Sequence, residues 1–249
     1  MATAPNNQAV RVGPSSTRDL VTLSGVLLVV GFIFNLIVTM VWHPAGEEDD
    51  HPAIFAEYAA SEGWVLTHFG QFLGVIVALA GLFVLCQALR SGLWPTLLAR
   101  FGMAALIGTA TAFAVLQAVD GITLKQAVDA WADASGPEKE LRFADAETVR
   151  WTEWGVQSYF RLLLGLSLLI VGAATILSRL LAAWLGYLLI LAGVLSIAIG
   201  IDVGYSGLAS GFQDALGPIS QLVLFAGAVA ILVVGMRGRV REPVEPRAV

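Results

Sequence analysis

The chain has 249 residues, of which 57% are hydrophobic and 13% are charged, and its net charge is −5. Soluble domains carry about 25% charged residues, so this composition excludes an ordinary soluble protein and favours a membrane protein. Because Cys86 is the single cysteine, an intrachain disulfide and a c-type haem attachment are excluded. A nucleic-acid partner is not expected, because the only basic stretch is the short C-terminal tail.

Six uncharged apolar runs follow one another along the chain. A helix needs roughly 20 apolar residues to cross the ~30 Å hydrocarbon core of a bilayer. We predict spanning helices at about 20–42, 64–89, 101–120, 157–178, 180–202 and 215–236. The predicted fold is therefore all-α, a polytopic bundle of six transmembrane helices that forms one domain over residues 20–236. Residues 1–19 lack a signal-peptide pattern and are predicted to be a disordered tail, and residues 237–249 form a second tail.

Two longer segments between the predicted spans are expected to form a helical cap. In residues 43–63, Pro52 can begin a short helix with Ile54, Phe55 and Tyr58 on one face. In residues 121–156, apolar residues at helical spacing predict two short helices separated by Gly136-Pro137. We expect these short helices to lie over the outer face of the bundle.

The basic residues predict the orientation of the bundle. With the N-terminus inside, the inner segments hold nine arginines, and the outer segments hold five basic residues in or beside one long loop. Sixteen of the 19 acidic residues then lie outside or at the outer membrane edge. The positive-inside rule therefore predicts cytoplasmic termini in the plasma (inner) membrane, with the acidic face outside.

Small residues at helical spacing mark faces where two helices can approach closely. Such faces occur at Gly186, Gly193 and Gly200, at Ala104, Gly108 and Ala112, and at Gly70 and Gly74. Packing within the bundle is the favoured interpretation, and the seam of a homo-oligomer is the alternative.

Polar side chains inside the spans collect in the outer halves of the helices. Asn35 and Thr39 are one turn apart, as are His68 and Gln71. Because polar groups are costly in hydrocarbon, they are expected to face the interior of the bundle and to enclose a polar cavity open to the outside. The candidate ligand-binding residues are Asn35, His68, Gln71, Gln117, Asp120, Glu153, Gln157, Arg161 and Asp202.

Arg161 is the most informative single candidate for a binding role, because it begins an apolar run in which a lone cation is disfavoured. It should either pair with a carboxylate, for which Asp120, Glu153 and Asp202 are the candidates, or extend its guanidinium outward to the membrane edge. The pair would be either a structural lock between helices or a charge that binds a ligand.

The three histidines, His43, His51 and His68, fall in a short stretch at the predicted outer edge, beside the acidic run at residues 47–50. Imidazole and carboxylate groups can bind a divalent metal, although the spacing matches no compact metal motif. Histidines that hydrogen-bond the loops, and a proton sensor, are the alternatives. The sequence predicts no other cofactor, and no catalytic motif is recognisable, so an enzymatic role is not favoured.

Several short motifs together resemble bacterial six-helix integral membrane proteins without an assigned activity. They are Trp42-His43-Pro44, Asp50-His51-Pro52, His68-Phe69-Gly70-Gln71-Phe72, Leu116-Gln117-Ala118-Val119-Asp120-Gly121 and Trp151-Thr152-Glu153-Trp154-Gly155. The resemblance covers most of residues 20–236 and implies the six-helix fold, but no reaction.

The favoured function is binding of a small ligand or cation in a polar cavity reached from outside, for transport or sensing. One alternative is a non-catalytic subunit or scaffold that binds another membrane protein. The other is a metal-dependent membrane enzyme that uses His43, His51 and His68.

Overall fold

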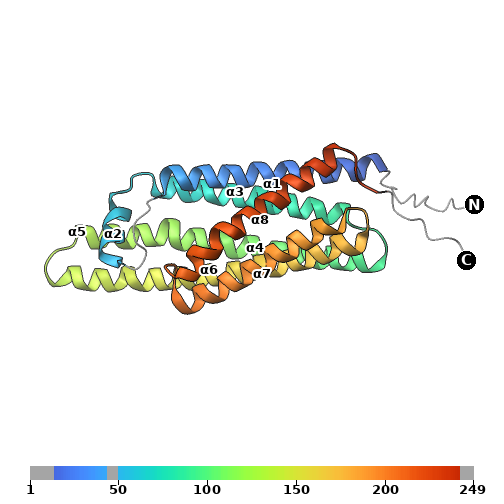
Figure 1. The fold of residues 1–249 in the computed structure, drawn as a ribbon. Helices are drawn as coiled ribbons and strands as arrows, with labels where there is room; N and C mark the ends of the chain where they lie inside the picture. The colour runs from blue at the N-terminus through green and yellow to red at the C-terminus, as the bar shows by residue number, and fades with distance from the viewer. Residues whose placement is uncertain (1–13, 44–49, 242–249) are drawn as a thin grey trace, which may run out of the picture.

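The computed structural model describes residues 14–43 and 50–241, and these residues form helices joined by short turns (Figure 1). The predictions for residues 1–13, 44–49 and 242–249 lie outside the described residues. The elements are α1 (Pro14–Trp42), α2 (His51–Ala60), α3 (Trp64–Ala88), α4 (Leu93–Ala118), the π-helical η1 (Val119–Leu124), α5 (Lys125–Asp133), α6 (Pro137–Ser178), α7 (Ala183–Ser206) and α8 (Gly211–Met236).

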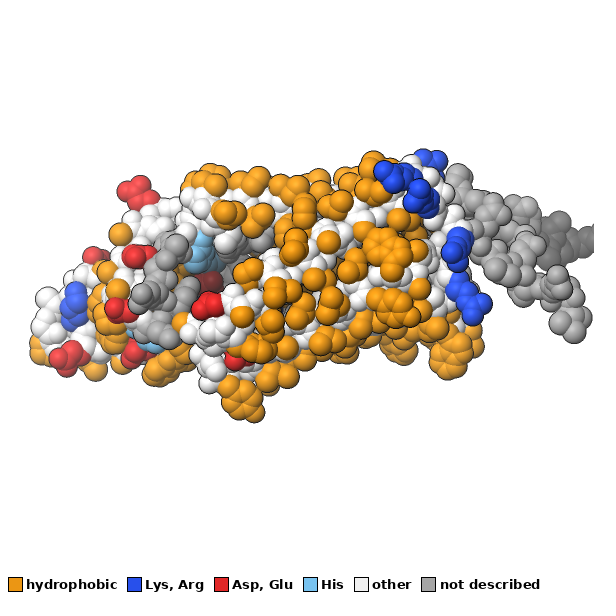
Figure 2. Space-filling view, in the orientation of Figure 1, with side chains coloured by type: hydrophobic (Ala, Val, Ile, Leu, Met, Phe, Trp, Pro, Cys, Tyr) orange, Lys and Arg blue, Asp and Glu red, His pale blue; other side chains and the backbone are white. Residues whose placement is uncertain are grey.

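Six of the helical stretches are long and apolar enough to cross a membrane, which confirms the six predicted spans. They are α1, α3, the continuous stretch from α4 through α5, α6, α7 and α8. Figure 2 shows a broad hydrophobic surface between two charged ends. The chain is therefore a multi-pass membrane protein.

The two ends of the bundle differ in charge, and we name them accordingly. The basic end is where α1 begins and α8 ends, and basic side chains gather there (Figure 2). The acidic end carries α2, α5 and the first turns of α6 (Figure 1). At the acidic end, Ile54, Phe55 and Tyr58 of α2 pack with Leu124 and Val128 in a separate apolar cluster, as predicted for the helix that Pro52 begins.

Helix α1 begins at Pro14, so the prediction of disorder up to residue 19 is wrong for residues 14–19. The physical reason is a contact that closes the bundle at its basic end. The Arg18 guanidinium donates hydrogen bonds to the carbonyl oxygens of Gly235 at 3.3 Å and Met236 at 2.9 Å. These carbonyls lie in the last turn of α8, where few N–H groups follow to bond them, so Arg18 ties the first turns of α1 to the end of α8.

The segment 121–156 does not form separate short helices. Helix α4 runs through η1 into α5, and α6 continues without interruption for 42 residues. The predicted break at Gly136-Pro137 is correct, because Gly136 adopts a φ of 60° and Pro137 begins α6. No proline follows within α6, so its polar first half can simply continue the spanning helix.

Glycines bring neighbouring helices into backbone contact. A Cβ atom placed on Gly186 of α7 would lie 2.6 Å from the carbonyl oxygen of Gly172 on α6, and one on Gly25 of α1 would lie 2.4 Å from Cα of Leu232 on α8. Gly70 and Gly74 also pack closely against α1: a Cβ on Gly70 would lie 2.9 Å from the Val38 side chain, and one on Gly74 would lie 2.9 Å from the Asn35 backbone nitrogen. The predicted packing within the bundle is confirmed at these positions. Gly108, by contrast, has no such neighbour within 4 Å among the described residues.

Candidate functional site

A cavity of about 360 Å³ lies inside the bundle, between α1, α3, α4, α6 and α8. Its wall is polar toward the acidic end, where α4 meets η1 and where the middle of α6 lies, and apolar toward the basic end. Figure 2 shows a hollow near the acidic end in which histidine and acidic side chains are visible. The apolar wall is formed by Leu28, Leu79, Leu82, Phe113, Leu164, Leu168 and Ala228, among others.

The structure brings together seven of the nine candidate residues predicted from the sequence. These seven line the cavity, and they are Asn35, Gln71, Gln117, Asp120, Glu153, Gln157 and Arg161. His68 is connected to the cavity through its hydrogen bond to Asp120. Asp202 does not line the cavity. Its carboxylate instead accepts hydrogen bonds from Ser210 and from Gln213 at the start of α8.

His68 and Asp120 form a buried pair at the edge of the cavity. His68 Nε2 lies 3.0 Å from Asp120 Oδ2, and His68 Nδ1 lies 2.8 Å from the carbonyl oxygen of Trp64. The Trp64 indole nitrogen in turn donates to the Asp120 carbonyl oxygen at 3.0 Å. A carbonyl oxygen only accepts, so Nδ1 carries a proton, and a second proton must lie between Nε2 and the carboxylate. The pair as a whole therefore has no net charge.

Arg150 and Glu153 form a second buried pair, which the sequence analysis did not identify. Both side chains are almost fully buried, and the Arg150 Nη1 donates to Glu153 Oε2. The guanidinium also lies over the rings of Tyr58 and Trp154, at 5.7 and 5.8 Å from their centroids. The i, i+3 spacing of an arginine and a glutamate was the available signal, but it does not reveal that this face of α6 is buried.

Among the described residues that line the cavity, Arg161 carries a charge with no opposite charge bonded to it. The predicted ion pair with Asp120, Glu153 or Asp202 is wrong, since each of these carboxylates has other partners. No ion pair or hydrogen bond joins the Arg161 side chain to any described residue, and its Nε has no accessible surface. Because an isolated charge is costly inside a membrane protein, Arg161 is the group in this site that most needs a partner.

The remaining polar groups supply hydrogen bonds to the cavity. Asn35 Nδ2 donates to the Gln71 carbonyl oxygen at 3.3 Å, and Gln71 Nε2 donates to Thr39 Oγ1 at 3.0 Å. Gln117 Oε1 and Asp120 Oδ1 are buried and have no hydrogen-bond donor in the described chain. Two acceptors therefore remain available in the polar half of the cavity.

The three histidines do not converge on one point. The rings of His43 and His68 are 5.6 Å apart, but His51 stacks on Phe55, and its Nδ1 lies 2.9 Å from Glu147 Oε1. Within the part of the chain that the structure describes, no group of three or more His, Cys, Asp and Glu side chains is arranged to hold a metal ion. The geometry thus gives the predicted metal site no support.

Several residues of the cavity wall were not predicted from the sequence. Gln221 of α8 was not among the candidate residues, and Tyr58 was named only as part of the apolar face of α2. Phe113 and Phe160, with ring centroids 4.7 Å apart, connect α4 to α6 next to Arg161. Aromatic residues in an apolar run give no signal of this kind, because their position depends on the rotation of each helix.

No family model matches this chain, and neither does any curated protein or solved structure.

Proposed function

We propose that this multi-pass membrane protein binds a small amphipathic monoanion, of the carboxylate class, in the cavity between α1, α3, α4, α6 and α8. The anionic group pairs with Arg161, and the apolar part fills the half of the cavity toward the basic end. The protein then serves in transport or sensing of this molecule in the plasma membrane. In this proposal the termini are cytoplasmic, and the acidic end, capped by α2 and α5, is outside.

The observation that carries the proposal is the charge balance of the cavity. His68 with Asp120, and Arg150 with Glu153, are each bonded pairs of acid and base. Arg161 has no such partner among the described residues. Among these groups, one positive charge is left, and a carboxylate would neutralise it with two parallel hydrogen bonds in the geometry that guanidinium groups favour. A bare cation, which the sequence analysis left open, would meet repulsion at this position.

The shape of the cavity supports an amphipathic ligand. Arg161 lies at the border between the two halves, since Leu164 and Leu168 follow it on α6 toward the basic end and Gln157 precedes it. The volume of about 360 Å³ is within the ~300–1,000 Å³ range of small-molecule sites. Gln117 Oε1, one turn from Phe113, is free to accept a hydrogen bond from a hydroxyl or amide group of the ligand.

The test compares ligands that differ only in their polar group. Purified protein in mild detergent is heated with hexanoate, 1-hexanol or hexylamine at 0.15 M ionic strength, where the ~8 Å screening length weakens the repulsion of anions by the acidic end. Hexanoate should raise the melting temperature. At a concentration 100 times its Kd, it should increase the free energy of unfolding by about 2.7 kcal/mol. The alcohol and the amine should have little effect, and 6-hydroxyhexanoate, whose hydroxyl would lie in the apolar half of the cavity, should bind more weakly than hexanoate.

Variants separate a binding charge from a structural one. Arg161→Met should lose the response to hexanoate while keeping or increasing its stability without ligand, because the substitution removes an unpaired buried charge. Arg142→Met, which changes an exposed arginine, should behave like the wild type. Equal responses to hexanoate and 1-hexanol would contradict the proposal, and so would an Arg161→Met protein that unfolds or that keeps the full response.

A further inference from the structure

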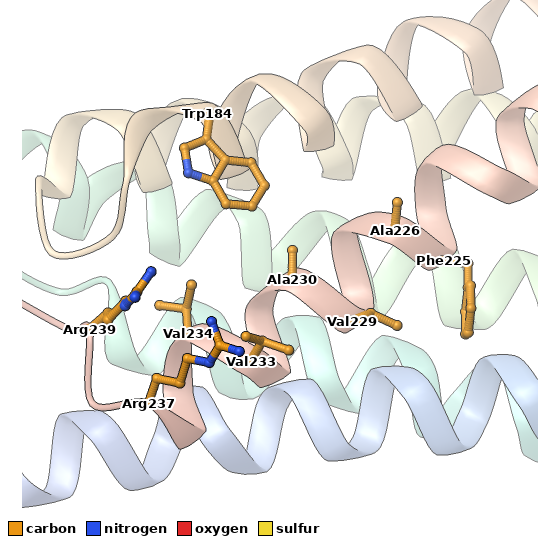
Figure 3. Close-up of a pocket in the computed structure, with 9 residues that line it drawn as sticks. All are labelled: Trp184, Phe225, Ala226, Val229, Ala230, Val233, Val234, Arg237 and Arg239. Carbon is orange, nitrogen blue, oxygen red and sulfur yellow. The ribbon is translucent and has the colours of Figure 1, made fainter.

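A second hollow, unrelated to the central cavity, lies on the membrane-facing surface between α7 and α8 at the basic end (Figure 3). Helix α8 packs against α1 near its C-terminal end, where Gly25 and Gly235 allow close approach, so it diverges there from α7 (Figure 1). The result is an open groove of about 490 Å³. Trp184 of α7 lies across it from Ala226 and Ala230 of α8 (Figure 3).

The groove is apolar along its length and positively charged at one end. Its wall on α8 runs from Phe225 to Val234, and Arg237 and Arg239 complete it at the membrane edge. At ~1.5 Å per residue, the stretch from Phe225 to Arg237 is about 18 Å long, which is close to the ~15 Å hydrocarbon depth of one leaflet. An extended acyl chain lying in the groove would therefore bring its headgroup to the two arginines.

The backbone fixes the positions of these arginines. Gly238 adopts a φ of 63°, its N–H donates to the Gly235 carbonyl oxygen, and the Arg239 N–H donates to the Val234 carbonyl oxygen. This is the Schellman arrangement that ends a helix with a glycine in the left-handed region. The Arg241 N–H then donates to the Leu180 carbonyl oxygen at 2.8 Å, which fastens the segment to the turn between α6 and α7.

Both guanidinium groups are available to a ligand. Neither Arg237 nor Arg239 forms a side-chain hydrogen bond or ion pair with a described residue, whereas the neighbouring Arg18 is occupied by the carbonyl groups that end α8. The remaining described charges at this end are also basic, apart from Asp19. Guanidinium groups bind phosphate bidentately, and basic pockets between membrane helices bind anionic lipid headgroups.

We infer that the groove between α7 and α8 is a binding site for an anionic phospholipid. One acyl chain lies along Ala226 and Ala230 beside Trp184, and the phosphate group is bound by Arg237 and Arg239. The cytoplasmic leaflet, which is rich in anionic lipids, would supply this ligand if the basic end is cytoplasmic. This inference is independent of what the central cavity binds.

The test counts lipids that stay bound to the intact protein. The full chain is equilibrated in mild detergent with equal amounts of phosphatidylglycerol and phosphatidylcholine with identical acyl chains, and native mass spectrometry measures the bound ratio. The wild type should retain phosphatidylglycerol preferentially. The preference should fall about 5-fold for each arginine removed, and on the order of 25-fold in the Arg237→Gln, Arg239→Gln double variant.

Two further variants make the test specific to the groove. The Arg90→Gln, Arg100→Gln double variant removes the same charge at the same end but outside the groove, and it should keep the preference. Ala230→Leu keeps both arginines but fills the groove, and it should lower phosphatidylglycerol binding. Equal retention of the two lipids by the wild type would overturn the inference, and so would a preference lost in both double variants or unchanged in Ala230→Leu. Stabilisation by glycerol phosphate as strong as that by phosphatidylglycerol would also overturn it, because the site would then bind the phosphate alone.

Discussion

The two halves of the bundle are held together by different kinds of contact. In the half toward the basic end, helices meet backbone to backbone, as at Gly186 with Gly172 and at Gly25 with Leu232. In the half toward the acidic end, side chains connect the helices, as in the pairing of His68 on α3 with Asp120 after α4. Close glycine contacts occur in both halves, as at Gly74 beside Asn35, but the buried polar groups are concentrated in the half toward the acidic end.

Because of this difference, the two halves should be sensitive to different kinds of substitution. Close backbone packing depends on shape alone, and shape cannot change without separating whole helices. Buried polar side chains depend on having the correct partner, and a missing partner is costly. We therefore expect the half toward the basic end to respond to changes in side-chain size and the half toward the acidic end to respond to changes in charge.

The largest effect should come from breaking the buried pair of Arg150 and Glu153. Glu153→Ala leaves the Arg150 charge buried without its carboxylate, and we expect it to lower the free energy of unfolding by about 3–5 kcal/mol. Unfolding by increasing SDS in mixed micelles measures this loss.

Two controls test whether charge is the cause. Glu138→Ala removes an exposed carboxylate that pairs with Arg142, and it should cost less than about 1 kcal/mol. The Arg150→Met, Glu153→Leu double variant replaces both charges with apolar groups and should recover most of the lost stability. A double variant as unstable as Glu153→Ala would show that packing, and not an unpaired charge, governs this half.

The next largest effect should come from adding one methyl group in the closely packed half. Gly186→Ala places a Cβ 2.6 Å from the Gly172 carbonyl oxygen and 2.5 Å from Ile176 Cγ1. Neither α6 nor α7 can accommodate it without moving, so we expect a loss of about 1–3 kcal/mol in the same SDS titration.

Gly108→Ala is the matched control, since a Cβ there meets no described side chain or neighbouring helix within 4 Å. It should leave stability unchanged or raise it by up to about 1 kcal/mol, because alanine favours the helix over glycine. Similar losses from the two substitutions would remove the contrast between the halves.

The spans could be predicted from the sequence because a membrane imposes one simple requirement, an uninterrupted apolar run. The ends of the helices could not, because outside the hydrocarbon a polar sequence is equally compatible with a helix, as the first turns of α1 and the first half of α6 show. The spacing of Asn35, Gln71 and Gln157 within their runs indicated faces that meet in one cavity.

The pairing of charges inside that cavity could not be predicted. Three carboxylates were plausible partners of Arg161, and the choice depends on how each helix is rotated. Asp120 lies in the π-helical η1, where an inserted residue changes the rotation of the chain, and it meets His68 instead. The Glu153 carboxylate accepts a hydrogen bond from Arg150, one turn away on its own helix. That Arg161 has no partner among the described residues is therefore a property of the assembled bundle.

The smallest effect should come from a polar contact in the half that depends on shape. Thr109 Oγ1 lies 3.0 Å from Ser167 Oγ and links α4 to α6, and it also donates to its own helix at the Ala105 carbonyl oxygen. Thr109→Val keeps the shape and removes the hydroxyl, and Ser167 can turn to a carbonyl of α6, so we expect a loss of about 0.6 kcal/mol. Thr111→Val, an exposed threonine bonded only to Ile107, provides the baseline. If Thr109→Val lowered the free energy of unfolding as much as Glu153→Ala, polar contacts would determine the stability of both halves. The proposed difference, with shape important in one half and charge in the other, would then be wrong.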